Sequence, residues 1–148
     1  MTTRTRTLDE ISVGDELPEL QIPVTRTVIV AGALATRDYE DVHHDPQRAV
    51  ERGTPDTYMS INNTNGLVGR YVTDWSGPAA VLVRLATRLG VPNFSGGTLV
   101  LTGRVKAKQD DTVTVAVTGT NSIGVHTSSE VTLRLPTSAA QQQPEVAE

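Results

Sequence analysis

The stretch "GTLVLTGRVKAKQDDTVTVAVTGTNSIGVHTSSEVTLRLP", residues 97–136, decides the fold of this chain. Apolar residues alternate with other residues in three runs, formed by Leu99, Leu101, Gly103 and Val105, by Val113, Val115 and Val117, and by Val131, Leu133 and Leu135. Alternation with a period of two predicts strands that bury one face. The segments "KQDDT" and "NSIGVH" separate the runs as hairpin turns, and Gly124 permits a positive φ in the second. The stretch therefore predicts an antiparallel meander.

The segments before this meander predict one more strand and one main helix. The dense apolar run "AAVLVRLATRLG", residues 79–90, predicts a central strand and the fourth member of the meander. The segment "DTYMSINNTNGLVGRYVTDW", residues 56–75, predicts a helix that Asp56 caps and that ends near Trp75. "TRTVIVAGALATRD", residues 25–38, is ambiguous between a strand and a short helix. A sheet with a helix on one face predicts an α+β fold, whose other face and edges subunit pairing would cover.

Length, composition and charge limit the classes of protein. The 148 residues suit one domain, which we expect over residues 11–136, between a flexible N-terminus at 1–10 and a disordered polar tail at 137–148. A net charge of −4 without a basic cluster argues against a nucleic-acid partner. No run approaches the roughly 18 apolar residues of a membrane span. The lack of cysteine removes thiol chemistry and fits a cytoplasmic location.

Acidic and histidine side chains crowd the stretch "LATRDYEDVHHDPQRAV", residues 34–50. In a continuous helix Asp38, Asp41 and Asp45 would line up and repel one another. We therefore expect the chain to turn after Asp38 and to begin a helix at Asp45–Pro46, where Asp45 caps. Such a turn brings Asp38 and His43 around one water, an arrangement suited to general acid/base catalysis. A metal site and a solvated polar turn are the alternatives.

The same stretch resembles the motif of the MaoC-like, (R)-specific enoyl-CoA hydratases, which is Gly-Asp-aromatic-Asn-Pro-aliphatic-His followed by Asp-Pro and Ala. The matching residues are Asp38, Tyr39, Val42, His43, Asp45, Pro46 and Ala49. The segment "ISVGDELPEL" is similar to that family's entry strand, and the meander fits its hot-dog fold, so the resemblance covers about residues 10–136. Three features depart from the family pattern: Arg37 replaces its Gly, Glu40-Asp41 replaces its Asn-Pro, and "DTYMSIN" replaces its "PIAHGM" helix opening.

Three further segments, "ALATRDYEDVHHD", "TNGLVGRYVTDWSGPAA" and "RLGVP", resemble the small MaoC-like subunits of actinobacterial steroid side-chain hydratases. The resemblance implies that Asp38 and His43 are catalytic. We favour Asp38 as the base and His43 as the proton donor, and the reverse stays open. It also implies a backbone donor to the thioester oxygen near Met59 or Ser60. Trp75 would either line a steroid pocket or fill the end of the core. Asp41 and His44 would either orient the catalytic pair or face solvent.

The activity implied by this resemblance is hydration of a steroid enoyl-CoA with a three-carbon side chain and a 17-ene, which gives the 17-hydroxyacyl-CoA. CoA would be part of the substrate, and we expect neither a cofactor nor a metal. The partner would be a larger subunit with a second MaoC-like domain and a DUF35-type domain that docks an aldolase, in a heterotetramer. Two other readings stay open: a non-catalytic hot-dog partner subunit and a hot-dog acyl-CoA thioesterase.

Overall fold

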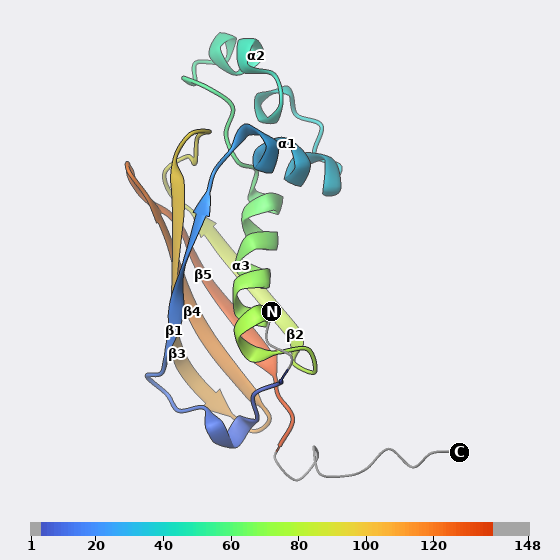
Figure 1. The fold of residues 1–148 in the computed structure, drawn as a ribbon, viewed down its shortest axis with the longest axis vertical. Helices are drawn as coiled ribbons and strands as arrows, with labels where there is room; N and C mark the ends of the chain where they lie inside the picture. Colours follow the sequence, from blue (N-terminus) through green and yellow to red (C-terminus); the bar gives the residue numbers. More distant parts are fainter. Residues whose placement is uncertain (1–3, 138–148) are drawn as a thin grey trace, which may run out of the picture.

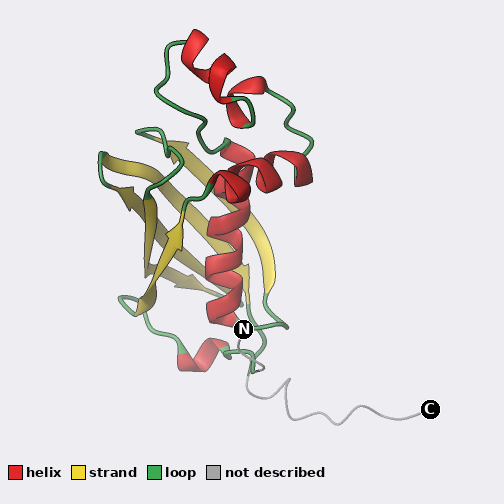
Figure 2. Ribbon diagram, turned by 45° about the horizontal axis from the view of Figure 1, so that its top comes forward, coloured by secondary structure: helices red, strands yellow, loops and turns green. Residues whose placement is uncertain are grey.

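The computed structural model describes residues 4–137, in which one antiparallel sheet packs against one long helix. The sheet has five strands in the order β1-β3-β4-β5-β2. Their bounds are Glu16–Pro23 for β1, Val81–Leu89 for β2, Thr98–Gln109 for β3, Thr112–Asn121 for β4 and Gly124–Arg134 for β5. Helix α3, Ile61–Ser76, runs along one face of the sheet (Figures 1 and 2). The predicted α+β class is therefore confirmed.

Two shorter helices lie beyond the N-terminal end of α3 (Figure 1). They are α1, Arg26–Ala35, and α2, Pro46–Glu51. The first settles the ambiguous segment at 25–38 as a helix, which begins where the Thr25 side chain accepts a hydrogen bond from the N–H of Val28 at 3.1 Å. The second begins as predicted, since the Asp45 carboxylate accepts from the N–H groups of Gln47 and Arg48.

The core lies between the sheet and α3, as the period-two patterns predict. The inward residues of β3, β4 and β5 are almost fully buried, and they meet Val68 and Val72 on the helix. Both predicted hairpin turns are present, and each contains a residue with a positive φ: Asp110 at 52° and Gly124 at 140°. The segment "ISVGDELPEL", which resembles the family's entry strand, leads into β1, and β1 pairs with β3.

Strand β2 is an edge strand, so the prediction of a central strand is wrong. It pairs with β5 at the far side of the sheet from β1, and only β3, β4 and β5 form the meander. Leu85 packs against the core, whereas Val81, Leu82 and Val83, which cover both faces, are exposed in this chain. A dense apolar run indicates that both faces of a strand need cover, but it does not say whether that cover comes from the same chain.

Helix α3 begins one turn later than expected. Ser60 is its N-cap, and the Ser60 Oγ accepts from the N–H of Asn63 at 3.2 Å. The prediction of Asp56 as the cap is therefore wrong, because that carboxylate binds other groups. The helix ends at Ser76, next to the predicted end at Trp75, and Gly77 follows with a φ of 96°.

Residues 4–10 pack against the domain, so the flexible segment predicted for 1–10 is wrong over this part. The N–H of Arg6 donates to the Ser76 carbonyl at 2.8 Å, and the N–H of Leu8 donates to the Pro136 carbonyl at 3.0 Å. Leu8 is buried in the core, which an alternating Thr-Arg sequence does not reveal. Residues 1–3, and the predicted disordered tail from residue 138 onward, lie outside the described residues.

Candidate active site

The turn after α1 brings Asp38 and His43 together, as their spacing predicts. Arg37 adopts a left-handed conformation with a φ of 56°, and the N–H of Asp38 donates to the Ala33 carbonyl at 2.9 Å. A 3₁₀ turn at Asp41–His43 then carries the imidazole back toward the carboxylate. The two side chains meet with His43 Nε2 at 3.7 Å from Asp38 Oδ2.

A backbone carbonyl fixes the orientation of the imidazole. His43 Nδ1 lies 2.7 Å from the carbonyl oxygen of Tyr58. Because a carbonyl only accepts, Nδ1 carries a proton and donates it. The Tyr58 ring also packs edge-on against the imidazole, with centroids 5.2 Å apart. Neutral His43 therefore presents an unprotonated Nε2 toward Asp38, and it can donate a proton from Nε2 only as the imidazolium.

The separation of the two side chains suits one bridging water. At 3.7 Å the two facing atoms are too far apart for a direct hydrogen bond. A single water can nevertheless stand at roughly 2.8 Å from both of them. The His43 side chain is 9% exposed and that of Asp38 is 19% exposed, and Val42 beside them is buried. The pair therefore has the geometry to hold a water and to move protons to and from it.

The segment before α3 offers one candidate for the thioester-oxygen donor. Met59 and Ser60 are both buried, and Tyr58 beside them contacts His43. The N–H of Met59 already donates to the Asn93 carbonyl at 3.0 Å. The N–H of Ser60 has no acceptor among residues 4–137, and it stands at the positive end of the α3 dipole. Of the two predicted residues, Ser60 is the one with an available donor.

Asp41 and His44 lie on the same turn, but their side chains form no hydrogen bond or ion pair to Asp38 or His43 among the described residues. Asp41 Oδ2 accepts from Arg52 at 3.1 Å, and Arg52 also lies 3.6 Å from Glu40. The other oxygen, Asp41 Oδ1, is buried without a partner among the described residues. The side chain of His44 is exposed. Their predicted orienting role stays a prediction.

Trp75 is not brought to the pair. It lies near the C-terminal end of α3, about 21 Å along the axis from Ile61 at 1.5 Å per residue. The Arg6 guanidinium sits 5.2 Å above its ring, and Arg6 Nε donates to the Trp75 carbonyl at 3.1 Å. A pocket of about 250 Å³ adjoins it, lined also by Tyr71 and Leu20. Within this chain, Trp75 and the pair do not share one site.

An ion pair between Asp56 and Arg26 lies beside the site, and the sequence does not predict it. We call this ion pair, together with the other hydrogen bonds of Asp56, the ionic junction. The Asp56 carboxylate accepts from Arg26 at 2.9 and 3.0 Å, from the Ser95 hydroxyl at 2.6 Å and from the N–H of Thr57 at 2.7 Å. The Ser95 hydrogen bond and the Thr57 N–H lower the pKa of Asp56. The junction ties α1 and the loop after β2 to the segment that carries the Tyr58 carbonyl. No local pattern signals it, because its members are far apart in the sequence.

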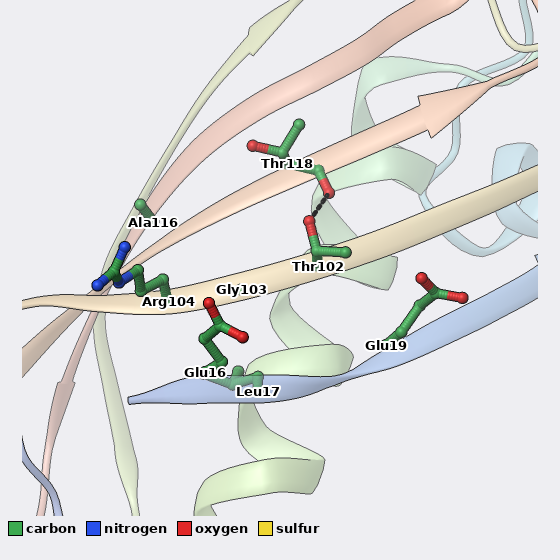
Figure 3. Close-up of a pocket in the computed structure, with 8 residues that line it drawn as sticks. All are labelled: Glu16, Leu17, Glu19, Thr102, Gly103, Arg104, Ala116 and Thr118. Carbon is green, nitrogen blue, oxygen red and sulfur yellow. Dashed lines mark hydrogen bonds between the residues drawn. The ribbon is translucent and has the colours of Figure 1, made fainter. Parts of the chain in front are cut away.

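Two further observations bear on ligands. A hollow of about 460 Å³ lies over the neighbouring strands β1, β3 and β4, lined by Glu16, Arg104 and six other residues, and it holds none of the predicted site residues (Figure 3). Among residues 4–137, no group of three or more His, Cys, Asp or Glu is placed to hold a metal ion.

Within residues 4–137, no helix is long and apolar enough to cross a membrane.

Comparison with known proteins identifies the family. The chain is 46% identical, over 83% of its length and 95% of the relative's, to the 3-oxo-4,17-pregnadiene-20-carboxyl-CoA hydratase beta subunit of Mycobacterium tuberculosis. It belongs to the MaoC-like hydratases. The structure also matches a chain in the crystal structure of the ChsH1–ChsH2 complex from the same organism, with 45% identity, a TM-score of 0.82 and coverage of 84% of this chain and 98% of that one.

A more distant hydratase shares the fold. The (R)-hydratase PhaJ1 of Pseudomonas aeruginosa has a TM-score of 0.82 at 19% identity, over 96% of this chain and 92% of that chain. At that identity the likeness concerns the fold alone, which is the predicted hot-dog fold. No family model matches the chain. The resemblance inferred from residues 10–136 is thus confirmed for both family and fold.

Proposed function

We propose that this chain is the catalytic small subunit of a heteromeric hydratase that adds water to a steroid enoyl-CoA. The substrate would carry a 17-ene in a three-carbon side chain, and the product would be the 17-hydroxyacyl-CoA. The observation that carries the proposal is the meeting of Asp38 and His43 at 3.7 Å, in a chain that is 46% identical to the beta subunit of a pregnadiene-carboxyl-CoA hydratase. A non-catalytic partner subunit would have no need to hold this pair.

The mechanism uses the pair and the start of α3. The Ser60 N–H and the helix dipole stabilise the enolate-like charge on the thioester oxygen. The water between the pair gives its hydroxide part to the β-carbon, and the α-carbon receives a proton, so the atoms of one water balance the product. Asp38 takes the proton of the water, and imidazolium His43 donates from Nε2 to the α-carbon. The Tyr58 carbonyl keeps Nδ1 committed throughout.

The reverse assignment has its own consequence. Neutral His43 would take the proton at Nε2 and then deliver it to the α-carbon, while Asp38 would stay ionised and hold the water. The two routes differ in the form of His43 that starts the reaction, which is the imidazolium in the first and the neutral imidazole in the second.

The remaining parts of the proposal concern assembly and location. The beta-subunit name of one relative and the ChsH1–ChsH2 complex of another support a partner subunit. We propose a larger partner with a second MaoC-like domain and a DUF35-type domain that docks an aldolase, in a heterotetramer. The reaction needs no cofactor or metal, since CoA belongs to the substrate. We place the enzyme in the cytoplasm, where acyl-CoA thioesters are used.

The proposal is tested with the co-expressed complex and the steroid enoyl-CoA, by following loss of the enoyl-thioester absorbance. We expect Asp38→Asn and His43→Ala to lower kcat by roughly 10²–10⁴-fold each, the usual contribution of a general acid or base. Glu51→Gln is the matched control, because it neutralises an exposed carboxylate on the nearby helix α2. Activity within tenfold of the parent in both site variants would remove the pair from catalysis. Release of free thiol instead of hydration would identify a thioesterase.

A further inference from the structure

The third histidine, His126, is buried under the first turn of α3, and the proposed mechanism does not use it. It lies on β5 and is 1% exposed. His126 Nδ1 lies 2.8 Å from the Val91 carbonyl, and its Nε2 lies 2.9 Å from the Thr64 hydroxyl. Thr64 is fully buried, and its hydroxyl is also 3.1 Å from the Ser60 carbonyl. One imidazole thus joins β5, the loop after β2 and the N-cap of α3.

The direction of these hydrogen bonds follows from the chemistry of each group. The Val91 carbonyl only accepts, so Nδ1 carries the proton and donates it. In the neutral imidazole Nε2 is then an acceptor, and the Thr64 hydroxyl donates to it. Burial lowers the pKa of His126, which favours this neutral form. The Ser60 carbonyl keeps its hydrogen bond from the Thr64 N–H at 3.0 Å. Through Thr64, the imidazole therefore fixes the first turn of α3 against the sheet.

That turn is the part of the helix on which the proposed chemistry depends. Ser60 carries the available N–H, and Tyr58, two residues earlier, holds His43 at 2.7 Å. We propose that His126, acting through Thr64, is a positioning residue that keeps the Ser60 N–H where it serves the thioester oxygen. This inference rests on the proposed hydratase function. A shift of about 1 Å in a donor that acts mainly on the developing charge lowers kcat by up to about 10²-fold and leaves substrate binding nearly unchanged.

The test removes the Thr64 hydroxyl while keeping its shape. In the co-expressed complex, with the steroid enoyl-CoA as substrate, we expect Thr64→Val to lower kcat by roughly tenfold or more and to change KM by less than about threefold. Thr64→Ser keeps the hydroxyl and should restore kcat to within about threefold of the parent. Thr73→Val is the matched control, because it makes the same substitution at the other end of α3, where the Thr73 hydroxyl donates to the Gly69 carbonyl of its own helix at 3.0 Å.

A second substitution tests His126 itself. In His126→Asn the amide keeps a donor near the Val91 carbonyl but lacks an atom that reaches Thr64. It should lower kcat as Thr64→Val does, and the double variant should fall no further, because both changes remove the same link. Thermal unfolding of each variant accompanies the kinetics, so that loss of folded complex is separated from loss of rate.

The outcomes separate this inference from the function on which it rests. A Thr64→Val complex with parental kcat, or one whose loss is matched by Thr73→Val or is not rescued by Thr64→Ser, means that the link is only structural and overturns the inference. If Asp38→Asn abolishes turnover in the same experiments, the hydratase function stands. A parent complex that hydrates no enoyl-CoA overturns both.

Discussion

Tyr71 joins the middle of α3 to β1 through one buried hydroxyl. It donates to the Pro18 carbonyl at 2.9 Å, where the pairing of β1 with β3 shifts register between Leu17 and Leu20. Burial, with a smaller contribution from the charge of Glu19, raises the pKa of Tyr71 to about 12. The folded state therefore favours the neutral phenol more strongly than the unfolded state does, in which the pKa is about 10.

A pH dependence of stability follows. The contribution of Tyr71 is fully present below about pH 10 and is lost as the pH rises through about 12. We expect the free energy of unfolding to fall less steeply over this range in Tyr71→Phe than in the parent. Below pH 10, Tyr71→Phe should be destabilised by about 1–3 kcal/mol, because it leaves the Pro18 carbonyl without its donor. Urea unfolding at a series of pH values measures both effects.

The control for this prediction is Tyr39→Phe. Tyr39 is 67% exposed, so Tyr39→Phe makes the same substitution without removing a buried hydroxyl. Equal slopes for Tyr71→Phe and the parent above pH 10 would contradict the assignment.

At the same scale, the sequence predicted that Asp38 and His43 meet, but not what holds them in place. The five-residue spacing of Asp38 and His43 is local, and like-charge repulsion within a helix already requires a turn there. The Tyr58 carbonyl that orients His43, and the Asn93 carbonyl that occupies the Met59 N–H, come from loops that only the folded sheet brings near. The position of His126 under α3 is likewise a tertiary fact.

At the scale of elements, α1 and α3 approach closely where Gly32 faces Asn63. A Cβ added at Gly32 would lie 2.2 Å from the side chain of Asn63, which donates from Nδ2 to the Val28 carbonyl at 3.1 Å. That side chain cannot move without losing this hydrogen bond. Asn63, which the sequence shows as an unusual polar residue on a central helix, is therefore a connector between the two helices.

Two glycine substitutions test this contact in opposite directions. Gly32→Ala should destabilise the protein by about 1–3 kcal/mol, because overpacking outweighs the roughly 1 kcal/mol gained from helix propensity. Gly66→Ala in α3 adds a Cβ that meets no atom within 4 Å and should stabilise by about 0.5–1 kcal/mol. Thermal unfolding of both variants measures the difference, and stabilisation by Gly32→Ala would show that Asn63 moves freely.

The predicted N-cap of α3, Asp56, is wrong because of contacts between elements. Asp56 and Ser60 are both good N-cap residues, and sequence alone ranks them nearly equally. The structure decides between them because Asp56 meets Arg26 and Ser95, which lie on other elements. A local cap signal is thus overruled by a tertiary ion pair.

At the scale of the whole molecule, β2 forms an exposed apolar edge of the sheet. Val81, Leu82, Val83 and Leu89 are 53%, 44%, 49% and 38% exposed on an edge strand whose outer backbone groups are available for pairing. Exposed apolar edge strands of this kind promote association. The apolar density that predicted a central strand is therefore explained if a partner subunit completes the sheet in the assembled enzyme.

The last prediction follows from this edge. Expressed alone, the chain should associate or precipitate and hydrate the steroid enoyl-CoA poorly, whereas co-expression with the larger subunit should give a soluble, active complex. Val83→Lys places a charge on the edge and should increase the soluble monomer of the isolated chain while weakening its assembly with the partner. Ile123→Lys makes the same change at the β4–β5 turn, where Ile123 is 56% exposed, and should leave assembly intact. Size-exclusion chromatography and turnover of each preparation report the outcome. A monodisperse isolated chain with the full activity of the complex would contradict the prediction that a partner subunit must cover β2.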